Sequence, residues 1–309
     1  MALFQPAPLQ KGDRVALIAP SGPLPEGRLP LALDAIRARG LEPVAYPSVT
    51  QTHGYLAGAD AVRAQDVNDA FADDSIKGVL CARGGYGAQR LYPRIDWENI
   101  RRHPKRFWGY SDITFFHLML TQRCGMVSYH TPMPSTEWYE GLDEYTDSWL
   151  DKALFGDVWG ELPNCDKAER KTVAPGKACG ELTGGNLSLV ASAVGTPYAM
   201  DAKDKIVFLE DVGERPYRVD GMLNHLVQSG ALSGCRGIVL GYYTDCNPPK
   251  DKPSLTLDEV FDELLAPLGV PVLSGVTCGH STPTLSLPIG CDAELDADAQ
   301  TLRIVEGEK

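Results

Sequence analysis

Short apolar runs alternate with amphipathic stretches of helix length along the first half of the chain. The apolar runs predict strands over 15–20, 43–47, 77–82, 106–109 and 126–130. The amphipathic stretches predict helices over 29–39, 59–73, 86–92 and 112–122. Short strands that are buried on both faces and separated by helices are typical of a parallel sheet with crossover helices. The pattern therefore predicts a doubly wound α/β domain over 1–155.

The second half repeats this alternation after a stretch of different composition. Residues 156–177 are rich in Gly, Pro and charge and lack periodicity, which predicts an interdomain linker. Beyond the linker, the pattern predicts helices over 186–194, 218–228 and 256–266 and strands over 205–210, 236–243, 270–275, 292–296 and 301–305. We expect a second, smaller domain over 178–309.

Composition and charge exclude several classes of protein. The chain has 309 residues and a net charge of −12, from 41 Asp and Glu against 29 Lys and Arg. A phosphate backbone is held by clustered Lys and Arg, so nucleic acid is not an expected partner. The one basic run, 101–106, is interpreted as a solvated surface loop. No apolar stretch reaches the length of about 18 residues that a membrane span needs.

The N-terminus and the cysteines indicate where the protein works. The start of the chain is interrupted by proline and has no basic segment before an apolar core, so it does not resemble a signal peptide. The eight cysteines are scattered and form no CxxC pair. We expect reduced, mostly structural thiols in a cytoplasmic protein.

A serine marks the boundary between the strand at 106–109 and the helix that follows. Ser111 lies in the sequence GYSDI, which resembles the nucleophile elbow of hydrolases but has isoleucine where GxSxG has its last glycine. A serine at this place also serves as a helix N-cap, because its hydroxyl accepts from first-turn N–H groups. The motif alone leaves both interpretations open.

A glycine-rich turn, RGGYG, follows the strand at 77–82. Its GxG resembles the start of a dinucleotide fingerprint, but Arg90 occupies the third glycine position and the run follows the third strand rather than the first. Gly84 and Gly85 can adopt dihedrals that expose backbone N–H groups. Such groups form an anion or oxyanion pocket, and a plain turn into a helix is the alternative.

Two loops of the second half supply the partners that a nucleophilic serine needs. Glu210 ends an apolar run, and His280 lies in a Gly/Ser/Thr/Pro loop. A serine needs a base to take its proton, and the imidazole needs a carboxylate to orient it. Glu214 is a rival carboxylate. Cys278 and His280 are the tightest pair of metal-ligand types, but no second pair accompanies them, so no metal is expected.

These residues lie in blocks that resemble the LD-carboxypeptidase family, also called murein tetrapeptide carboxypeptidases. The resemblance covers nearly the whole length and includes GDRVALIAPSG, CARGGYGAQR, GYSDIT, GGNLSL, FLEDVGERPYRVDGML and GHSTPTLSLPIG. It implies a flavodoxin-like N-terminal domain that bears the serine and a smaller, β-rich α/β C-terminal domain that bears the other two residues. The active site would lie in the cleft between them.

The resemblance implies a Ser-His-Glu peptidase. The serine of GYSD is Ser111, the glutamate of LED is Glu210 and the histidine of GHS is His280. The oxyanion donors would be the N–H of Asp112 and one from the glycine turn, with Gly85 preferred to Gly84. The family removes terminal D-alanine from the L-centre of diaminopimelate or lysine in tetrapeptides, during peptidoglycan recycling.

The resemblance implies less about substrate contacts and assembly. Arg83 and Gly84 are candidates for binding the substrate, Arg83 through its carboxylate. Gly184 and Asn186 are also candidates, although Asn186 is equally a helix cap. Relatives are usually homodimers, and no cofactor is implied.

Two other functions remain as alternatives at this stage. Some members of the family hydrolyse an aminoacyl-nucleotide amide in microcin C self-immunity, and they tend to carry an aromatic loop between the serine and the glutamate. Here that interval holds Trp138, Trp149 and Trp159 without an obvious insertion. The other alternative is a non-catalytic muropeptide sensor, which would have no physical need for all three of Ser111, Glu210 and His280.

Overall fold

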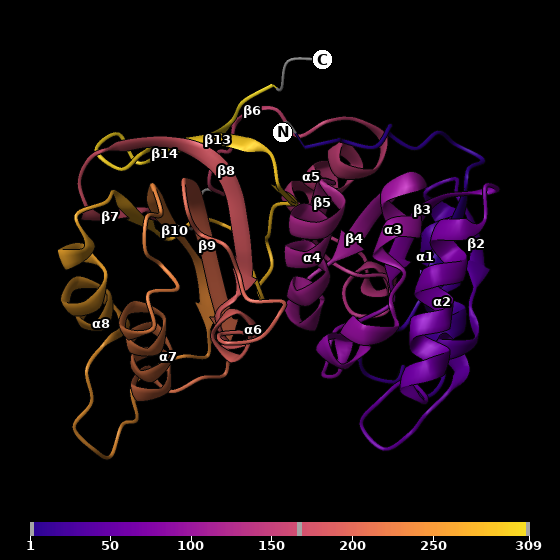
Figure 1. Cartoon of the computed structure of the whole chain (residues 1–309), viewed down its shortest axis with the longest axis horizontal. Coiled ribbons are helices and arrows are strands. Elements are labelled where there is room, and N and C mark those ends of the chain that lie inside the picture. Colours follow the sequence, from indigo (N-terminus) through magenta and orange to yellow (C-terminus); the bar gives the residue numbers. More distant parts are fainter. Residues whose placement is uncertain (1–2, 166–168, 307–309) are drawn as a thin grey trace. The chain divides into compact units, whose positions relative to one another are not determined.

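The computed structural model describes residues 3–165 and 169–306 and contains two compact units (Figure 1). The first unit comprises Met1–Asp157 and Ser286–Pro288, and the second comprises Val158–Leu285 and Ile289–Lys309. A short segment from late in the chain thus belongs to the first unit.

The first unit is built on a six-stranded sheet in the order β12-β5-β4-β3-β1-β2. Its strands are β1 (Arg14–Ile18), β2 (Glu42–Ala45), β3 (Ile76–Cys81), β4 (Arg106–Gly109), β5 (Ser128–His130) and β12 (Leu287–Ile289). The first five pair in parallel. Their order, 2-1-3-4-5, is that of flavodoxin, as the resemblance implied. Strand order reverses between β1 and β3, where such sheets bind ligands.

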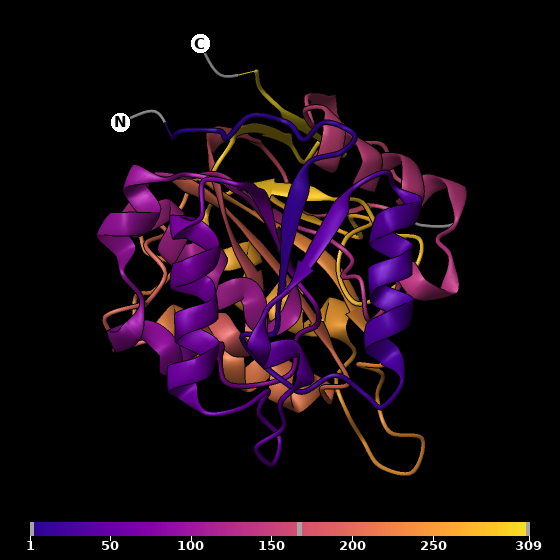
Figure 2. The same cartoon turned by 90° about the vertical axis from the view of Figure 1, so that its right-hand side faces the viewer.

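Helices lie on both sides of this sheet, as Figure 2 shows. They are α1 (Arg28–Ala38), α2 (Asp60–Ala72), α3 (Trp97–Arg102), α4 (Thr114–Cys124) and α5 (Glu144–Phe155), with 3₁₀ turns η1 (Pro47–Thr50), η2 (Ala88–Arg94), η3 (Ser111–Ile113) and η4 (Trp138–Glu140). The sequence pattern predicts the place of α1, α2 and α4 but not α3 or α5. The helix predicted over 86–92 is the 3₁₀ helix η2, which includes Pro93.

The interpretation of 101–106 as a solvated loop is wrong for its second half. Arg101 and Arg102 end α3 and are exposed, but Lys105 and Arg106 are buried. The Arg106 guanidinium donates to the carbonyls of Pro6 and Ala153, both at 2.8 Å. Lys105 Nζ donates to the carbonyl of Ala70 at 2.9 Å, near the end of α2. A run of positive charge thus supplies donors to buried carbonyls that secondary structure leaves unpaired.

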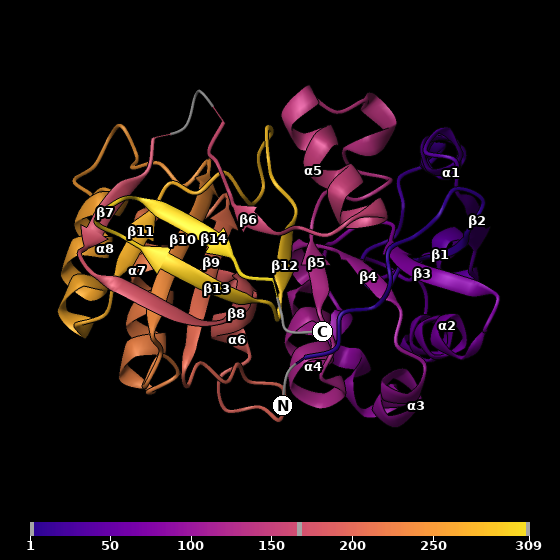
Figure 3. The ribbon, with the colours of Figure 1, turned by 90° about the horizontal axis from the view of Figure 1, so that it is seen from above.

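The second unit contains an eight-stranded sheet in the order β6-β14-β13-β8-β9-β10-β11-β7. Its strands are β6 (Gly160–Glu161), β7 (Lys171–Ala174), β8 (Lys177–Asn186), β9 (Lys205–Val212), β10 (Gly237–Thr244), β11 (Val272–Ser274), β13 (Asp292–Asp296) and β14 (Thr301–Ile304). The strands from β8 to β11 are parallel, whereas β13 pairs antiparallel with β8 and β14, which lie beside it in Figure 3. The helices are α6 (Leu187–Ser192), α7 (Pro216–Gln228) and α8 (Leu257–Leu264), with the 3₁₀ turn η5 (Ala266–Leu268).

The segment predicted as a linker, 156–177, contributes two strands to the second sheet. Its strand β6 pairs with β14, and β7 pairs with β11. Both are short strands at the two ends of the sheet, and their mostly polar side chains give no hydropathy signal. Residues 166–168 of the predicted linker lie outside the described residues.

Candidate active site

Ser111 occupies a strained turn between β4 and α4. Its φ is +65°, in the left-handed region that non-glycine residues seldom adopt. The N-cap positions of η3 and α4 are Tyr110 and Ile113, and neither makes a side-chain cap hydrogen bond. The interpretation of Ser111 as an N-cap is therefore wrong. Strain at a serine that caps nothing is typical of a functional site.

The glycine turn after β3 lies against this serine. A Cβ on Gly84 would be 2.8 Å from the Ser111 Cβ and 3.0 Å from its Oγ. Gly85 has φ +125° and approaches Gly22 closely, since a Cβ there would lie 3.1 Å from the Gly22 nitrogen. Only glycine fits either position, because any side chain would displace the serine or the neighbouring loop.

The carboxylate of Asp112 holds this turn from inside the unit. It is fully buried and accepts from the Ser21 hydroxyl at 2.6 Å and from the Ala88 N–H at 2.8 Å. Burial raises the pKa of the Asp112 carboxyl. The side chain of the residue after Ser111 is thus structural, so any catalytic role falls to its N–H group.

Arg63 holds the same turn from α2. Its buried guanidinium donates to the carbonyls of Pro20 and Gly87, the latter at 3.0 Å. The loops after β1 and β3 are therefore fixed to one another by a charged side chain. Sequence reasoning missed Arg63 and Ser21, although Ser21 stands in the block GDRVALIAPSG.

The dinucleotide interpretation of the glycine turn fits the structure poorly. The turn leads into a 3₁₀ helix, and the carboxylate of Asp112 accepts the first N–H of that helix, from Ala88. A phosphate needs exposed N–H groups at a helix N-terminus, not a carboxylate. Arg83 donates from Nη1 to the carbonyl of Pro23 at 3.0 Å, so it bonds the main chain rather than an acidic residue.

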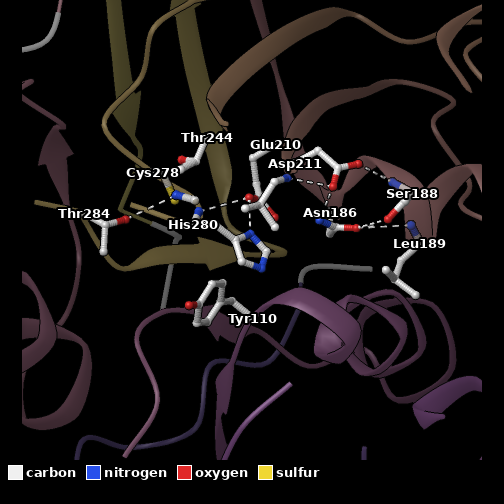
Figure 4. Close-up of polar contacts among 12 residues, drawn as sticks. Tyr110, Asn186, Ser188, Leu189, Glu210, Asp211, Thr244, Cys278, His280 and Thr284 are labelled. Atoms are coloured by element: carbon white, nitrogen blue, oxygen red, sulfur yellow. Dashed lines mark hydrogen bonds and ion pairs between the residues drawn. The ribbon is translucent and has the colours of Figure 1, made fainter. Parts of the chain in front are cut away.

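In the second unit, Glu210 and His280 form a hydrogen-bonded pair (Figure 4). His280 Nδ1 lies 2.7 Å from Glu210 Oε2, and the His280 backbone N–H donates to the same oxygen at 3.2 Å. Glu210 is fully buried on β9, and the imidazole is partly exposed. Since the carboxylate accepts from Nδ1–H, Nε2 is the basic nitrogen of the neutral ring.

The rival carboxylate is engaged elsewhere. Glu214, which lies just before α7, pairs with Arg218 in the first turn of that helix at 3.4 Å. Gly279 leaves the space in which the Glu210 carboxylate reaches His280. A Cβ at position 279 would lie 2.8 Å from Glu210 Oε2. Gly279 also has φ +132°, and its N–H donates to Thr284 Oγ1 at 3.2 Å. Sequence reasoning did not identify Gly279, although it stands in the GHS block.

Asp211, next to Glu210, is the most perturbed carboxyl of this region. Burial, above all, raises its pKa to about 6, and the charge of Glu210 acts in the same direction. It accepts from Asn186 Nδ2 at 3.1 Å and from the Ser188 N–H at 2.9 Å (Figure 4). Asp211 therefore fixes the end of β8 and the start of α6 beside the Glu210 strand.

The two predicted substrate contacts of this unit, Gly184 and Asn186, both have structural roles. Asn186 is the N-cap of α6 and accepts from the Leu189 N–H at 3.3 Å. Gly184 lies where β8 meets β9, and a Cβ there would come within 2.1 Å of the Phe208 carbonyl oxygen. Both residues shape the strand that lies next to Glu210.

Metal-binding and membrane-spanning features can be assessed for the described residues. Residues 3–165 and 169–306 contain no group of three or more His, Cys, Asp or Glu suited to a metal ion. All eight cysteines are free thiols, and burial raises the pKa of Cys278 far above its usual range. In the same part of the chain, no helix is long and apolar enough to cross a membrane.

Comparison with known proteins gives a consistent result. The model of the LD-carboxypeptidase N-terminal domain matches residues 15–131, and that of the C-terminal domain matches 179–295. A probable murein peptide carboxypeptidase of Bacillus subtilis is 40% identical over 98% of this chain and 95% of its own length. The murein tetrapeptide carboxypeptidase of Pseudomonas aeruginosa is 30% identical over 92% of this chain and 94% of its own.

Solved structures share the fold. The muramoyltetrapeptide carboxypeptidase of Oxalobacter formigenes has a TM-score of 0.82 at 29% identity and covers 96% of this chain and 100% of its own. An MccF-like protein of Bacillus anthracis has a TM-score of 0.88 at 25% identity, over 98% and 100% of the two chains. With both domain models matched in order and a relative 40% identical along nearly its whole length, the chain belongs to the LD-carboxypeptidase family of serine peptidases.

Proposed function

We propose that this protein is a serine LD-carboxypeptidase that removes terminal D-alanine from murein tetrapeptide. The observation that carries the proposal is the strained Ser111, which has φ +65°, makes no cap hydrogen bond and follows a buried strand. The names of relatives that align over nearly the whole chain support the substrate class.

In the proposed reaction, Ser111 Oγ attacks the carbonyl of the L-centred residue and gives its proton to His280 Nε2. Glu210 stabilises the imidazolium through Nδ1–H, at the observed 2.7 Å. The N–H groups of Asp112 and Gly85 stabilise the oxyanion. His280 then protonates the departing amine of D-alanine, and a water molecule hydrolyses the acyl-serine, returning the proton to the enzyme through His280.

The substrate contacts are a further part of the proposal. Arg83 binds the terminal carboxylate of D-alanine, because a cationic fork suits a carboxylate and its Nε has no hydrogen-bond partner among the described residues. Gly84 leaves room beside Ser111 for the scissile carbonyl. For Gly184 and Asn186 we propose an indirect role, since both maintain the backbone next to Glu210.

The test is release of free D-alanine from L-Ala-γ-D-Glu-meso-diaminopimelate-D-Ala. We expect Ser111→Ala to reduce kcat by at least about 10³-fold, because the nucleophile is lost. Ser148→Ala is the matched control, since its hydroxyl is exposed and donates within its own helix α5, to the Tyr145 carbonyl at 3.0 Å. Release that Ser111→Ala leaves unchanged would contradict the proposal.

Hydrolysis of an aminoacyl-nucleotide amide is a second candidate. The TM-score of 0.88 to the MccF-like protein favours it. The burial of Trp138 and Trp149 in the first unit argues against it, because neither ring is accessible to a nucleobase. Trp138 Nε1 also donates to the Pro132 carbonyl at 2.9 Å. Cleavage of aspartyl sulfamoyl adenosine without cleavage of tetrapeptide would establish this second function.

A further inference from the structure

The residue before Ser111 is tied to a later loop of the first unit. Tyr110 has an extended backbone, and its hydroxyl donates to Glu137 Oε1 at 2.6 Å. Both side chains are half-buried, so water competes only in part for this short hydrogen bond to a carboxylate. The proposed reaction assigns no role to either residue.

The Glu137 carboxylate is itself held by the backbone of its loop. Its Oε2 accepts from the Met133 N–H at 2.8 Å and from the Thr136 hydroxyl. The Glu137 N–H donates to the Met133 carbonyl at 3.2 Å, which closes the turn between the two residues. The carboxylate therefore lies in a fixed position, from which Oε1 holds the Tyr110 hydroxyl.

The loop over 131–137 is also tied to both turns of the candidate site. The Thr131 N–H donates to the carbonyl of Gly109, the last residue of β4, at 3.2 Å. The Ser135 N–H and hydroxyl both donate to the carbonyl of Ala82, at 3.0 and 2.7 Å, and Ala82 directly precedes the glycine turn. This loop thus braces the end of β3 and the end of β4 against one another.

The attachment of Tyr110 at both of its ends bears on the conformation of Ser111. The Tyr110 carbonyl accepts from the Ile113 N–H at 3.3 Å, and a Cβ on Gly84 would lie 3.4 Å from the same oxygen. The hydroxyl end is held by Glu137. A residue with φ +65°, such as Ser111, keeps this conformation only where its surroundings prevent it from relaxing.

We propose that Glu137 is a positioning residue that acts through the Tyr110 hydroxyl and holds Ser111 in its strained conformation. Glu137 itself touches neither the substrate nor the reacting atoms. Its effect on the rate follows from geometry, because a misplacement of about 1 Å lowers a rate by about 10²-fold. The kinetic consequence rests on the proposed function, whereas the effect on Ser111 is measurable without a substrate.

The first test is a double-mutant cycle in D-alanine release from tetrapeptide. We expect Tyr110→Phe and Glu137→Ala each to lower kcat by about tenfold and to change KM by less than about twofold, because only the placement of the nucleophile changes. The double variant should resemble Glu137→Ala, since both changes break the same hydrogen bond. Glu137→Gln should retain more activity, because its amide oxygen still accepts. Glu140→Ala is the matched control, since Glu140 is exposed and accepts from the hydroxyl of the neighbouring Tyr139.

The second test is the φ of Ser111 in crystal structures of the wild type, Tyr110→Phe and Glu137→Ala. We expect Ser111 to leave the left-handed region in part or in full in both variants. Tyr110→Phe keeps the ring and removes one oxygen, so it tests the hydrogen bond even if Glu137→Ala folds poorly.

Several outcomes would overturn the inference. They are an unchanged φ at Ser111 in both variants, kcat losses that multiply to about 10²-fold in the double variant, or wild-type kcat with only a lower urea midpoint. If the wild type releases no D-alanine, the proposed function fails and the φ of Ser111 alone decides the role of Glu137. If D-alanine is released and φ is the same in all three proteins, the proposed function stands and the role of Glu137 fails.

Discussion

At the scale of single residues, the buried carboxylate of Glu210 has one clear task. It is inaccessible to solvent and directs Oε2 at both the Nδ1 and the backbone N–H of His280. Its other oxygen, Oε1, has no hydrogen-bond partner among the described residues. A buried charge with so few partners is costly, and it is retained where the charge itself is needed.

Replacing this charge tests that task. We expect Glu210→Gln to reduce kcat by about 10³-fold or more with KM little changed, because an amide of the same shape neither stabilises the imidazolium nor fixes the tautomer. Glu214→Gln is the matched control, since Glu214 pairs with Arg218 instead. A Glu210→Gln enzyme with wild-type kcat would show that His280 acts without this carboxylate.

Asp211 makes stability depend on pH. Its pKa of about 6 exceeds the ordinary value of 3.8, so between these values the folded protein keeps a proton that the unfolded chain has lost. The free energy of unfolding should therefore fall as pH rises from 4 to 6, by up to about 3 kcal/mol, and stay constant above pH 6 as far as this group is concerned. Asp211→Asn removes the contribution.

Urea unfolding of both proteins from pH 4 to pH 7 measures the effect. The wild type should lose stability relative to Asp211→Asn across the window between pH 4 and pH 6, and the two curves should run parallel above it. Curves that are parallel over the whole range would mean that Asp211 titrates near its ordinary pKa in the folded protein.

The site residues differ in how far sequence reveals them. Glu210 and His280 could be predicted because an apolar run ends at one and a glycine-rich loop contains the other, and the structure pairs them. Arg63 and Asp211 could not, because their roles depend on which carbonyl or N–H group lies opposite them in space. A buried polar side chain has no pattern of its own along the chain.

At the scale of elements, β8 and β9 form the part of the second sheet that carries Glu210. The two strands pair in parallel, with Gly184 opposite Phe208 and Asn186 opposite Glu210. At Gly184 the backbones are so close that a Cβ would lie 2.1 Å from the Phe208 oxygen, and φ is +112°. The strand next to Glu210 thus tolerates no side chain at this position.

Substitution of Gly184 should therefore be severe. We expect Gly184→Ala to lower the free energy of unfolding by more than about 2 kcal/mol, from strain in φ and displacement of β9. Gly221→Ala is a matched control on α7, where an added Cβ meets nothing within 4 Å. That change should be neutral or stabilising by up to about 1 kcal/mol. Equal effects of the two substitutions in urea unfolding would argue against the close approach at Gly184.

The same strands show which elements a sequence reveals. The strands β1, β3, β9 and β10 are apolar and buried over most of their length, so their positions could be predicted. The position of β8 could not be predicted, because its ten residues include three glycines and alternate in burial only at one end. Strands β6, β7 and β12 are too short to show a period at all.

At the scale of the whole molecule, the first unit depends on a segment encoded far away in sequence. Ser286–Pro288 belongs to it, and β12 lies at the edge of its sheet, next to β5. Leu287 is fully buried there, and Thr131 Oγ1 lies 2.5 Å from Ser286 Oγ. The sequence pattern assigned these residues to the second domain, because hydropathy shows that a strand is buried but not in which sheet it lies.

A fragment of residues 1–157 should therefore be less stable than the intact chain. It lacks β12, which exposes the edge of β5 and removes the burial of Leu287, worth about 2–3 kcal/mol by itself. We expect a lower urea midpoint and self-association by size-exclusion chromatography. A second fragment, with residues 286–290 joined after 157 through a Gly/Ser linker, should recover much of the midpoint and remain monomeric. If the short fragment already unfolds as a monomer at the midpoint of the longer one, β12 is dispensable to the first unit, and the return of the chain serves the second unit instead.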